Sequence, residues 1–439
     1  MTRLHDVIGI GVGPFNLGLA CLADPIDDLD CVFLEARDEL AWHPGMMLDD
    51  ATLQVPFLAD LVTMADPTSR WSFLNYLKET GNLYPFYIRE SFYPLRREYD
   101  DYCRWAAEGV GSVRFGQPVT SVEHDGAAYV VTSATGEVFR GRRVVLGVGT
   151  TPRVPEALCD VVDAGFEARS ARTSATVCHS ADYLGRKAEL QAGGSITVVG
   201  SGQSAAEVYH DLLSESTAHD YTLTWLTRSP RFFPMEYTKL TLEMTSPEYT
   251  AYFQGLPTGV RGDLLREQRS LYKGISGDLV DAIFDLHYRL RVTGDGPRTT
   301  LVTNTEVVGA AYVGGGVHLD LHHTETDEAF GLTTEGLVLA TGYSSQVPTF
   351  LDGIRDRLRL DDTGRFLASS TYAVDHTGHE VFVQNAEEHT HGFVAPDLGM
   401  GAFRNSVIVA ALTGREVYPV EKRIAVQSFG VPDHLKGAS

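Results

Sequence analysis

The stretch Asp6-Val-Ile-Gly-Ile-Gly-Val-Gly-Pro-Phe-Asn-Leu-Gly18 decides the fold. Its apolar start predicts a strand, its glycines predict a tight turn, and the residues up to Ala23 predict a helix. A second apolar run over residues 31–34 follows and ends at Glu35. This order of strand, turn, helix, strand and acid is typical of the βαβ unit that binds a dinucleotide.

The residues of the turn each have a physical task in such a unit. Gly11 forms the turn, and Gly13 lets the backbone approach a pyrophosphate. The helix that begins near Pro14 points unpaired N–H groups at that pyrophosphate. Asn16 stands where a third glycine is usual, and Glu35 is placed to accept a hydrogen bond from a ribose hydroxyl. A glycine-rich strand end is the alternative, but the complete strand–turn–helix context favours a cofactor site.

A second unit of the same form begins near the middle of the chain. Residues 195–199 predict a strand, and Gly200-Ser-Gly-Gln-Ser-Ala-Ala-Glu207 predicts the turn into a helix. The next predicted strand ends at Arg228, where an NAD site would place a carboxylate. Because a cation suits the 2′-phosphate of NADP, we expect Arg228, with Arg231 near it, to bind that phosphate. The alternative is a solvated arginine.

Two nucleotide-binding units predict an α/β fold with two Rossmann-like domains, one inserted into the other. We expect residues 1–190 and 336–439 to form the first domain, which binds FAD. Residues 191–232 and 301–335 should form the second domain, which binds NADPH. Residues 233–300 have an aromatic and helical pattern, and we expect this small region to cover the substrate cleft.

Charge and cysteine content exclude several classes of protein. The 439 residues carry a formal net charge of −22, so nucleic-acid binding is not expected, because a phosphate backbone requires basic patches. The acidic balance suits a cationic substrate. Five cysteines without a CxxC pair argue against a disulfide framework and a zinc site, and no metal site is predicted.

The cysteines and the N-terminal stretch indicate where in the cell the protein is located. Thiols that form no framework fit the core of a protein in a reducing cytoplasm. The N-terminal stretch is apolar, but its Asp6, Asn16 and glycines fit neither a signal peptide nor a membrane span. We therefore expect a cytoplasmic protein without membrane association.

A nicotinamide cofactor that faces a flavin indicates hydride transfer, for which the protein supplies orientation and electrostatics. Disulfide reductases pass the electrons on to a CxxC pair, and this sequence has none. The other common outcome is reaction of the reduced flavin with O₂, which gives a C4a-hydroperoxide that transfers an oxygen atom.

Motifs spread over nearly the whole chain resemble one family, the N-hydroxylating flavin monooxygenases of siderophore biosynthesis, which act on lysine, ornithine or diamines. The motifs that carry this resemblance are Gly11-Val-Gly-Pro-Phe-Asn-Leu-Gly18, Trp42-His43, Leu53-Gln-Val-Pro-Phe-Leu-Ala-Asp-Leu-Val62, Pro67-Thr-Ser69, Phe73-Leu-Asn-Tyr-Leu77, Gly200-Ser-Gly-Gln-Ser-Ala-Ala-Glu207, Ala340-Thr-Gly-Tyr343 and Thr390-His-Gly392.

The resemblance implies FAD, NADPH and O₂ as reactants, a hydroperoxyflavin sheltered by NADP⁺, and an N-hydroxylated primary amine as product. It implies a homo-oligomer, a tetramer or a dimer, and flavin-driven chemistry without a strong side-chain base. The FAD contacts that it implies are Gly11, Gly13, Pro14, Phe15, Asn16, Glu35, Trp42, His43, Gln54, Val119 and Leu398. The NADPH contacts that it implies are Gly200, Gly202, Gln203, Ser204 and Arg228. The segment from His179 to Tyr183 resembles loosely the HxxxY end of a wider flavin-monooxygenase signature.

One departure from the family bears on the substrate. Where the amino-acid hydroxylases have Phe-Leu-Lys-Asp-Leu, with a lysine that pairs with the substrate carboxylate, this chain has Ala59. A charge-assisted hydrogen bond contributes roughly 1.5–3 kcal/mol, so lysine or ornithine should be held poorly. A diamine has no carboxylate, and a lysine at this place would repel its second ammonium.

Other positions agree with a diamine such as cadaverine or putrescine. A serine expected on the substrate side of the flavin is Gly399 here. The distal ammonium needs an acidic partner, and we expect at least one of four acids to face it: Glu243, Glu387, Glu388 and Asp397.

Three other functions stay open at this point. A lysine N6-hydroxylase could use another cation, such as Lys273, for the carboxylate. A carbon or sulfur oxygenase is disfavoured because the full FxGxxxH signature is absent. A non-catalytic or oxidase-like flavoprotein is disfavoured because the motifs of both nucleotide sites are intact.

Overall fold

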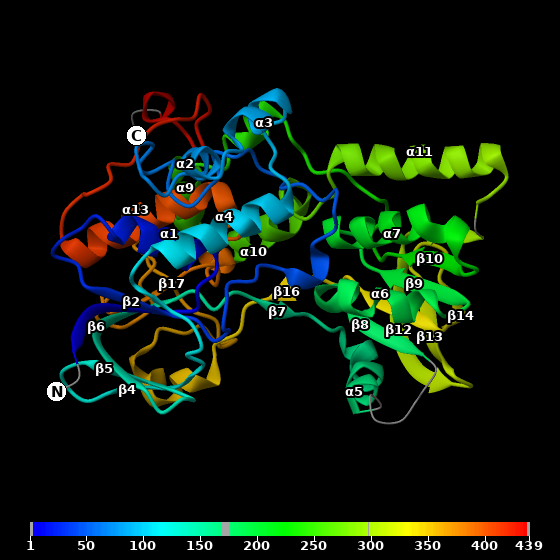
Figure 1. Ribbon diagram of the computed structural model, residues 1–439, viewed down its shortest axis with the longest axis horizontal. Coiled ribbons are helices and arrows are strands. Elements are labelled where there is room, and N and C mark those ends of the chain that lie inside the picture. The colour runs from blue at the N-terminus through cyan, green and yellow to red at the C-terminus, as the bar shows by residue number, and fades with distance from the viewer. Residues whose placement is uncertain (1–2, 168–174, 297, 437–439) are drawn as a thin grey trace.

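Two sheets organise the chain, one toward each end of the molecule (Figure 1). The computed structural model describes residues 3–167, 175–296 and 298–436. The first sheet has the order β3-β2-β1-β6-β5-β4, and β17 also pairs with β6. Its strands are β1 (Leu4–Ile10), β2 (Cys31–Leu34), β3 (Val113–Arg114), β4 (Val119–His124), β5 (Tyr129–Ser133), β6 (Val138–Leu146) and β17 (Val381–Val383).

Both faces of the first sheet are covered. Helices on one face bury a core cluster that includes Leu17, Tyr102 and Ile408; they are α1 (Pro14–Ala23), α4 (Arg96–Gly109) and α13 (Gly401–Thr413). On the other face, the short helix η7 (Thr349–Arg357) buries Leu351 and Ile354 against the sheet. The strand, helix and second strand predicted at the start of the chain are confirmed as β1, α1 and β2.

The second sheet is parallel throughout and has the order β11-β10-β9-β15-β8. Its strands are β8 (Thr176–His179), β9 (Ser195–Val199), β10 (Thr222–Leu226), β11 (Thr299–Val302) and β15 (Gly336–Leu339). One face packs on α6 (Tyr183–Gln191), α7 (Gln203–Glu215) and α11 (Gly277–Thr293). The other packs on α5 (Cys159–Glu167) and on an antiparallel sheet of β12 (Thr305–Val313), β13 (Gly316–His323) and β14 (Glu328–Thr334).

This strand pairing corrects the expected domain boundaries. The sequence predicts that the first unit resumes at residue 336 and therefore includes β15. In the structure β15 pairs with β9, at the centre of the second sheet. β8 was also expected in the first unit and pairs with β15. Both runs are short and apolar, and such a run fits the interior of either parallel sheet equally well. The two crossings between the units pair with each other through β7 (Thr151–Pro152) and β16 (Tyr343–Ser344).

The helical region is smaller than the predicted range 233–300. α11 packs on α7, and β11 lies in the second sheet, so both belong to the second unit. The remaining helices of the described residues in this range are α8 (Lys239–Leu242), α9 (Pro247–Gln254), α10 (Thr258–Glu267) and the short helix η6 (Gln268–Leu271). Tyr249 and Phe253 of α9 are buried against Phe393 and Met400 of the first unit.

A C-terminal segment, residues 424–427, fastens this helical region. The carboxylate of Glu248 accepts hydrogen bonds from the backbone N–H groups of Ile424 and Ala425. The carboxylate of Glu243 accepts from those of Val426 and Gln427. None of the described helices combines the length and apolarity that crossing a membrane requires.

The completely buried Asn16 joins three parts of the first unit. Its Nδ2 donates to the carbonyl oxygen of Gly11 (2.8 Å) and lies 3.3 Å from that of Val145 in β6. Its Oδ1 accepts from Nε2 of Gln384, which follows β17 (2.7 Å). An asparagine therefore replaces the usual glycine because its amide ties the turn to two returning strands.

We predict that Asn16→Ala lowers the free energy of unfolding by about 2–4 kcal/mol, because it leaves buried carbonyl and amide groups without partners. Urea denaturation followed by tryptophan fluorescence measures this change. Asn82→Ala, at an exposed asparagine, is the control and should change the stability by less than about 0.5 kcal/mol. An equal effect of the two substitutions would contradict the role assigned to Asn16.

Candidate active site

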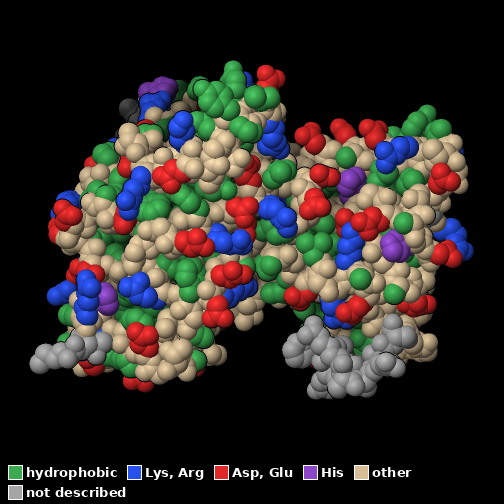
Figure 2. All heavy atoms as spheres, in the orientation of Figure 1, with side chains coloured by type: hydrophobic (Ala, Val, Ile, Leu, Met, Phe, Trp, Pro, Cys, Tyr) green, Lys and Arg blue, Asp and Glu red, His purple; other side chains and the backbone are tan. Residues whose placement is uncertain are grey.

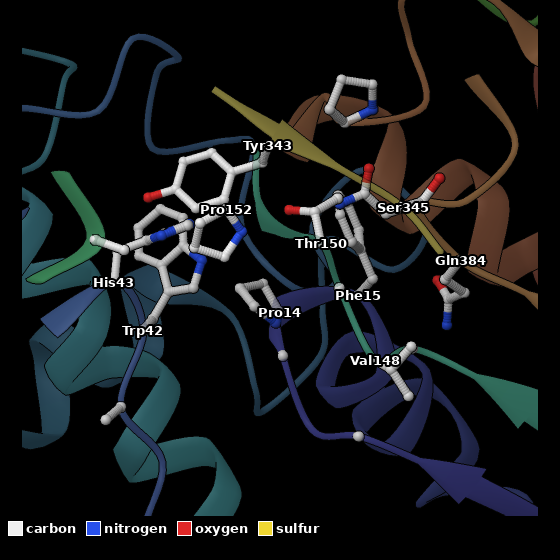
Figure 3. A pocket seen from close by; sticks show the side chains of 18 of the residues that line it. Pro14, Phe15, Trp42, His43, Val148, Thr150, Pro152, Tyr343, Ser345 and Gln384 are labelled. Atoms are coloured by element: carbon white, nitrogen blue, oxygen red, sulfur yellow. The ribbon is translucent and has the colours of Figure 1, made fainter. Parts of the chain in front are cut away.

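A cavity of about 960 Å³ lies between the two units. Its wall includes the turn after β1, the residues around Trp42, the first residues of α7, residues 272–274 and the segment after β17. Figure 3 shows Trp42, His43 and Tyr343 on one side and Phe15 and Gln384 on the other. Both predicted nucleotide-binding turns therefore open into one space.

Most of the predicted cofactor residues line this cavity. They are Gly11, Gly13, Pro14, Phe15, Glu35, Trp42, His43, Gln54, Val119, Gly202, Gln203, Ser204 and Leu398. The three exceptions are Asn16, Gly200 and Arg228. The side chain of Asn16 is fully engaged in hydrogen bonds within the protein, and Gly200 packs against Ala340, which itself lines the cavity.

The first turn has the shape that a dinucleotide requires. Gly11 has a φ of 85°, and a Cβ atom there would lie 2.6 Å from the carbonyl oxygen of Gly147. A Cβ atom on Gly13 would meet no protein atom within 4 Å, so the space beside it is open to a ligand. The carboxylate of Glu35 is fixed by the backbone N–H groups of Val12 (2.8 Å) and Arg37 (3.0 Å). The residues present therefore fit the pyrophosphate and ribose of FAD.

The second turn repeats this arrangement. A Cβ atom on Gly200 would lie 2.2 Å from the carbonyl oxygen of Ala340, so only glycine fits there. Gly202 caps the N-terminus of α7. Arg228 and Arg231 follow β10, the strand that pairs with β9, and both are exposed. Neither residue lines the cavity.

Aromatic rings and one strained backbone position shape the wall near the crossings. His43 has a left-handed backbone (φ 51°), which is uncommon for a residue other than glycine and clusters at functional sites. Its ring lies 4.9 Å from that of Trp42 and 6.0 Å from that of Tyr343. The backbone N–H of Trp42 donates to Asp100 on α4 (2.8 Å), which holds this loop in place.

One of the four predicted substrate acids, Glu388, lines the cavity. It is the first residue of α12 (Glu388–His391), and its carboxylate accepts a hydrogen bond from the Tyr272 hydroxyl. Burial, and then the charge of Glu388, raise the pKa of Tyr272 above its ordinary value. The Nζ of Lys273 lies 3.8 Å from the same carboxylate. Tyr272 and Lys273 lie in the segment between α10 and α11 and also line the cavity.

The other three acids lie outside the residues that line the cavity, and each has a structural partner. Glu387 is completely buried and forms an ion pair with Arg404 (3.1 Å). Glu243 binds the C-terminal segment, and those backbone N–H groups lower its pKa. Asp397 accepts a hydrogen bond from the backbone N–H of Gly399 (2.7 Å), and burial raises its pKa.

The two positions that depart from the amino-acid hydroxylases are neighbours. A Cβ atom on Gly399 would lie 3.8 Å from Cβ of Ala59 and 3.1 Å from Oδ1 of Asp397. Ala59 is buried. Ala59 and Gly399, both small and uncharged, therefore lie next to each other. Gly399 directly follows the segment 396–398, of which Pro396 and Leu398 line the cavity.

Sequence reasoning missed several residues of the wall. Gln384 and Asn385 follow the buried strand β17 and line the cavity, and ligands of parallel sheets bind at the carboxyl ends of strands. That rule could have found them. In the loose His179–Tyr183 match, Tyr183 is completely buried and donates to Asp211 (2.5 Å), and the two residues that line the cavity are Ala181 and Asp182.

Comparison with known proteins agrees with this geometry. The family model described as L-lysine 6-monooxygenase/L-ornithine 5-monooxygenase matches residues 3–345. A putrescine N-hydroxylase of Shewanella oneidensis is 46% identical, over 97% of this chain and 84% of that protein.

Two solved structures are similar over nearly their whole lengths. The FAD-bound cadaverine monooxygenase of the desferrioxamine pathway from Erwinia amylovora has a TM-score of 0.91 and 47% identity, over 98% of this chain and 99% of that one. The ornithine N-hydroxylase of Kutzneria with reduced FAD, NADP⁺ and L-ornithine has a TM-score of 0.83 and 27% identity, over 94% and 99%. On the match of the family model and the identity to the Shewanella relative, this chain belongs to the L-lysine 6-monooxygenase/L-ornithine 5-monooxygenase family.

Proposed function

We propose that this chain is an FAD- and NADPH-dependent monooxygenase that hydroxylates one primary amine of a linear diamine, cadaverine or putrescine, for hydroxamate siderophore biosynthesis. The observation that carries the substrate is that the buried Ala59 adjoins Gly399, so that neither position provides a cation for a substrate carboxylate, and the nearest charged group is the carboxylate of Asp397. The relatives at 46% and 47% identity are named for putrescine and cadaverine, whereas the ornithine enzyme is 27% identical.

The reaction balances as amine, O₂, NADPH and a proton giving hydroxylamine, NADP⁺ and water. Bound FAD supplies the redox chemistry that delivers one oxygen atom to the amine nitrogen. The chain would hold it through the α1 N-terminus, Glu35 and the wall around Trp42, and would hold NADPH through Gly202, Gln203 and the arginines after β10.

The protein must also set the charge of the two amines. A free primary amine has a pKa near 10.4, and only the neutral form is a nucleophile. Desolvation in the cavity lowers the pKa of the reacting nitrogen. We assign the distal ammonium to Glu388, the predicted acid in the cavity wall.

Lysine N6-hydroxylation is the second candidate, with Lys273 as the partner of the carboxylate. Lys273 does line the cavity. Its Nζ lies 3.8 Å from the carboxylate of Glu388, so each charge of the pair offsets the other. The contact therefore weighs equally on a substrate carboxylate at Lys273 and on a substrate ammonium at Glu388, and the diamine is favoured by Ala59, where the amino-acid hydroxylases have a lysine.

Two further features concern the setting of the enzyme. All five cysteines are free thiols, which supports a reducing compartment, and we place the enzyme in the cytoplasm.

Hydrophobic side chains gather over α3 (Leu83–Ile88) at the top of the molecule (Figure 2). Tyr84, Tyr87, Ile88 and Phe92 are each at least 70% exposed, and exposed apolar patches mark interaction sites. We propose that this patch joins copies of the chain into a homo-oligomer.

For the substrate, we predict that kcat/KM is higher for cadaverine or putrescine than for lysine and ornithine. Ala59→Lys should lower kcat/KM for the preferred diamine about tenfold or more, because it adds a positive charge beside the segment 396–398 of the cavity wall, and this charge repels a cationic substrate. Ala59→Met is the control for bulk without charge. Hydroxylamine product is measured, since NADPH loss alone includes peroxide formation. Preference of the unaltered enzyme for lysine would reject the proposal.

For the coenzyme, we predict that Arg228→Ala raises KM for NADPH about tenfold or more, because a charge-assisted contact with the 2′-phosphate is lost. KM for NADH, which lacks this phosphate, should change little. Initial rates with both coenzymes measure the difference, and Arg231→Ala shows whether the second arginine contributes. Equal changes in KM for both coenzymes would show that Arg228 does not bind the 2′-phosphate.

For the assembly, we predict that Tyr87→Glu together with Ile88→Glu reduces the oligomer to a smaller species, because a desolvated charge opposes burial of the patch. Sedimentation velocity measures the mass. The matched control places the same pair of glutamates at Phe284 and Tyr288, an exposed pair on α11. Loss of assembly only in the control would move the interface to α11.

A further inference from the structure

Two glutamine side chains meet where the two units face each other across the cavity. Gln54 belongs to the first unit, and Gln203 is the first residue of α7 in the second. Nε2 of Gln54 donates to Oε1 of Gln203 at 2.9 Å, and both residues line the cavity. The hydroxyl of Tyr237, which lies just before α8, donates to the backbone carbonyl of Gln54.

The orientation of the Gln203 amide is fixed from both of its ends. Its Oε1 also accepts a hydrogen bond from the backbone N–H of Ser276 (2.8 Å). Its Nε2 donates to the carboxylate of Glu207, one helical turn further along α7 (2.9 Å). A backbone N–H can only donate and a carboxylate can only accept. Gln203 therefore has one amide orientation that satisfies both neighbours.

Glu207 is itself held from across the interface. It is 6% exposed and forms a two-pronged ion pair with Arg96 of α4, at 2.7 and 3.0 Å. Arg96 is 13% exposed and also donates to the carbonyl oxygen of Met46 (2.6 Å). The counter-charge of Glu207 thus comes from the first unit, although Glu207 lies in the second.

We propose that Glu207 is a positioning residue, which orients the Gln203 amide and through it leaves the carbonyl oxygen of Gln54 as an acceptor for a ligand in the cavity. Because the nitrogen of Gln54 is committed to Gln203, its oxygen is the end available to a bound cofactor or amine. If Glu207 is lost, the Gln203 nitrogen has no acceptor, and the backbone N–H of Ser276 is the remaining contact that orients the Gln203 amide apart from Gln54 itself. Gln203 is then free to turn away from Gln54, and the Gln54 amide loses the partner that fixes its orientation at the junction of the two nucleotide sites. The effect on amine oxygenation rests on the proposed function, whereas the effect on NADP⁺ binding does not.

The test compares Glu207→Gln in two backgrounds, the unaltered enzyme and Gln54→Leu, in the FAD-loaded form. In the unaltered enzyme Oε1 of Glu207 accepts from both Arg96 and Gln203, and Oε2 accepts from Arg96. A glutamine at 207 replaces one of these oxygens by an amide nitrogen, which cannot accept, so at least one of the three bonds is lost. We expect the dissociation constant of NADP⁺, measured by calorimetry, to rise about threefold or more. The ratio of hydroxylamine formed to NADPH consumed should fall about threefold or more. In the Gln54→Leu background, Glu207→Gln should change both quantities by less than about 1.5-fold, because residues that act as a unit are not additive.

Two further variants separate positioning from general stability. Glu380→Gln breaks an ion pair with Arg357 that lies within the first unit (2.8 Å), and it should leave both quantities unchanged. Glu207→Asp keeps a charge toward Arg96 but withdraws the carboxylate from Gln203, so it should impair NADP⁺ binding while FAD content and melting temperature are retained. It also serves if Glu207→Gln fails to fold.

Equal effects of Glu207→Gln in both backgrounds, or a Glu207→Asp enzyme with unaltered NADP⁺ binding, would overturn the proposal. Absence of any hydroxylamine from diamines in the unaltered enzyme would instead reject the proposed function, and the cycle measured with NADP⁺ would still report on Glu207.

Discussion

The structure depends on one steric constraint that occurs twice: a glycine packed against the backbone carbonyl at the end of the neighbouring strand of its own sheet, where the chain leaves for the other unit. Gly11 lies against Gly147, and Gly200 lies against Ala340, with no room for a Cβ atom in either place. Each contact lets the helix that follows begin at the carboxyl end of its sheet, with its N–H groups directed at a ligand. Since the strands that end at these carbonyls, β6 and β15, lead into the paired crossings β7 and β16, the two helix ends open into the same cavity.

Local sequence signals were enough for this part of the molecule. The turns at Gly11 and Gly200 are read from glycine spacing, and the flanking strands from short apolar runs. The division of strands between the sheets was not readable in the same way, because residues 336–339 carry no feature that distinguishes one sheet from the other. Pairing with β9 is a long-range contact, and a local pattern does not encode it.

The substrate acids show a second limit of sequence reasoning. Four carboxylates had equal standing in the sequence, yet Glu387 is neutralised by Arg404 and Glu243 is bound to backbone N–H groups. A buried or bonded acid has its electrostatic partner already, and that partner is remote in sequence. Ala59 and Gly399 were found because the resemblance gave each a reference residue. Their contact, in contrast, follows only from the fold.

The bonds from Glu243 and Glu248 to residues 424–427 have a consequence for biosynthesis on the ribosome. Both nucleotide-binding turns are translated hundreds of residues before this segment, and helices α8 and α9, which it fastens, also precede it. The bonds to Glu243 and Glu248 can form only when residues 424–427 have left the exit tunnel. The two nucleotide-binding turns therefore leave the ribosome before these helices receive their last fixed contacts.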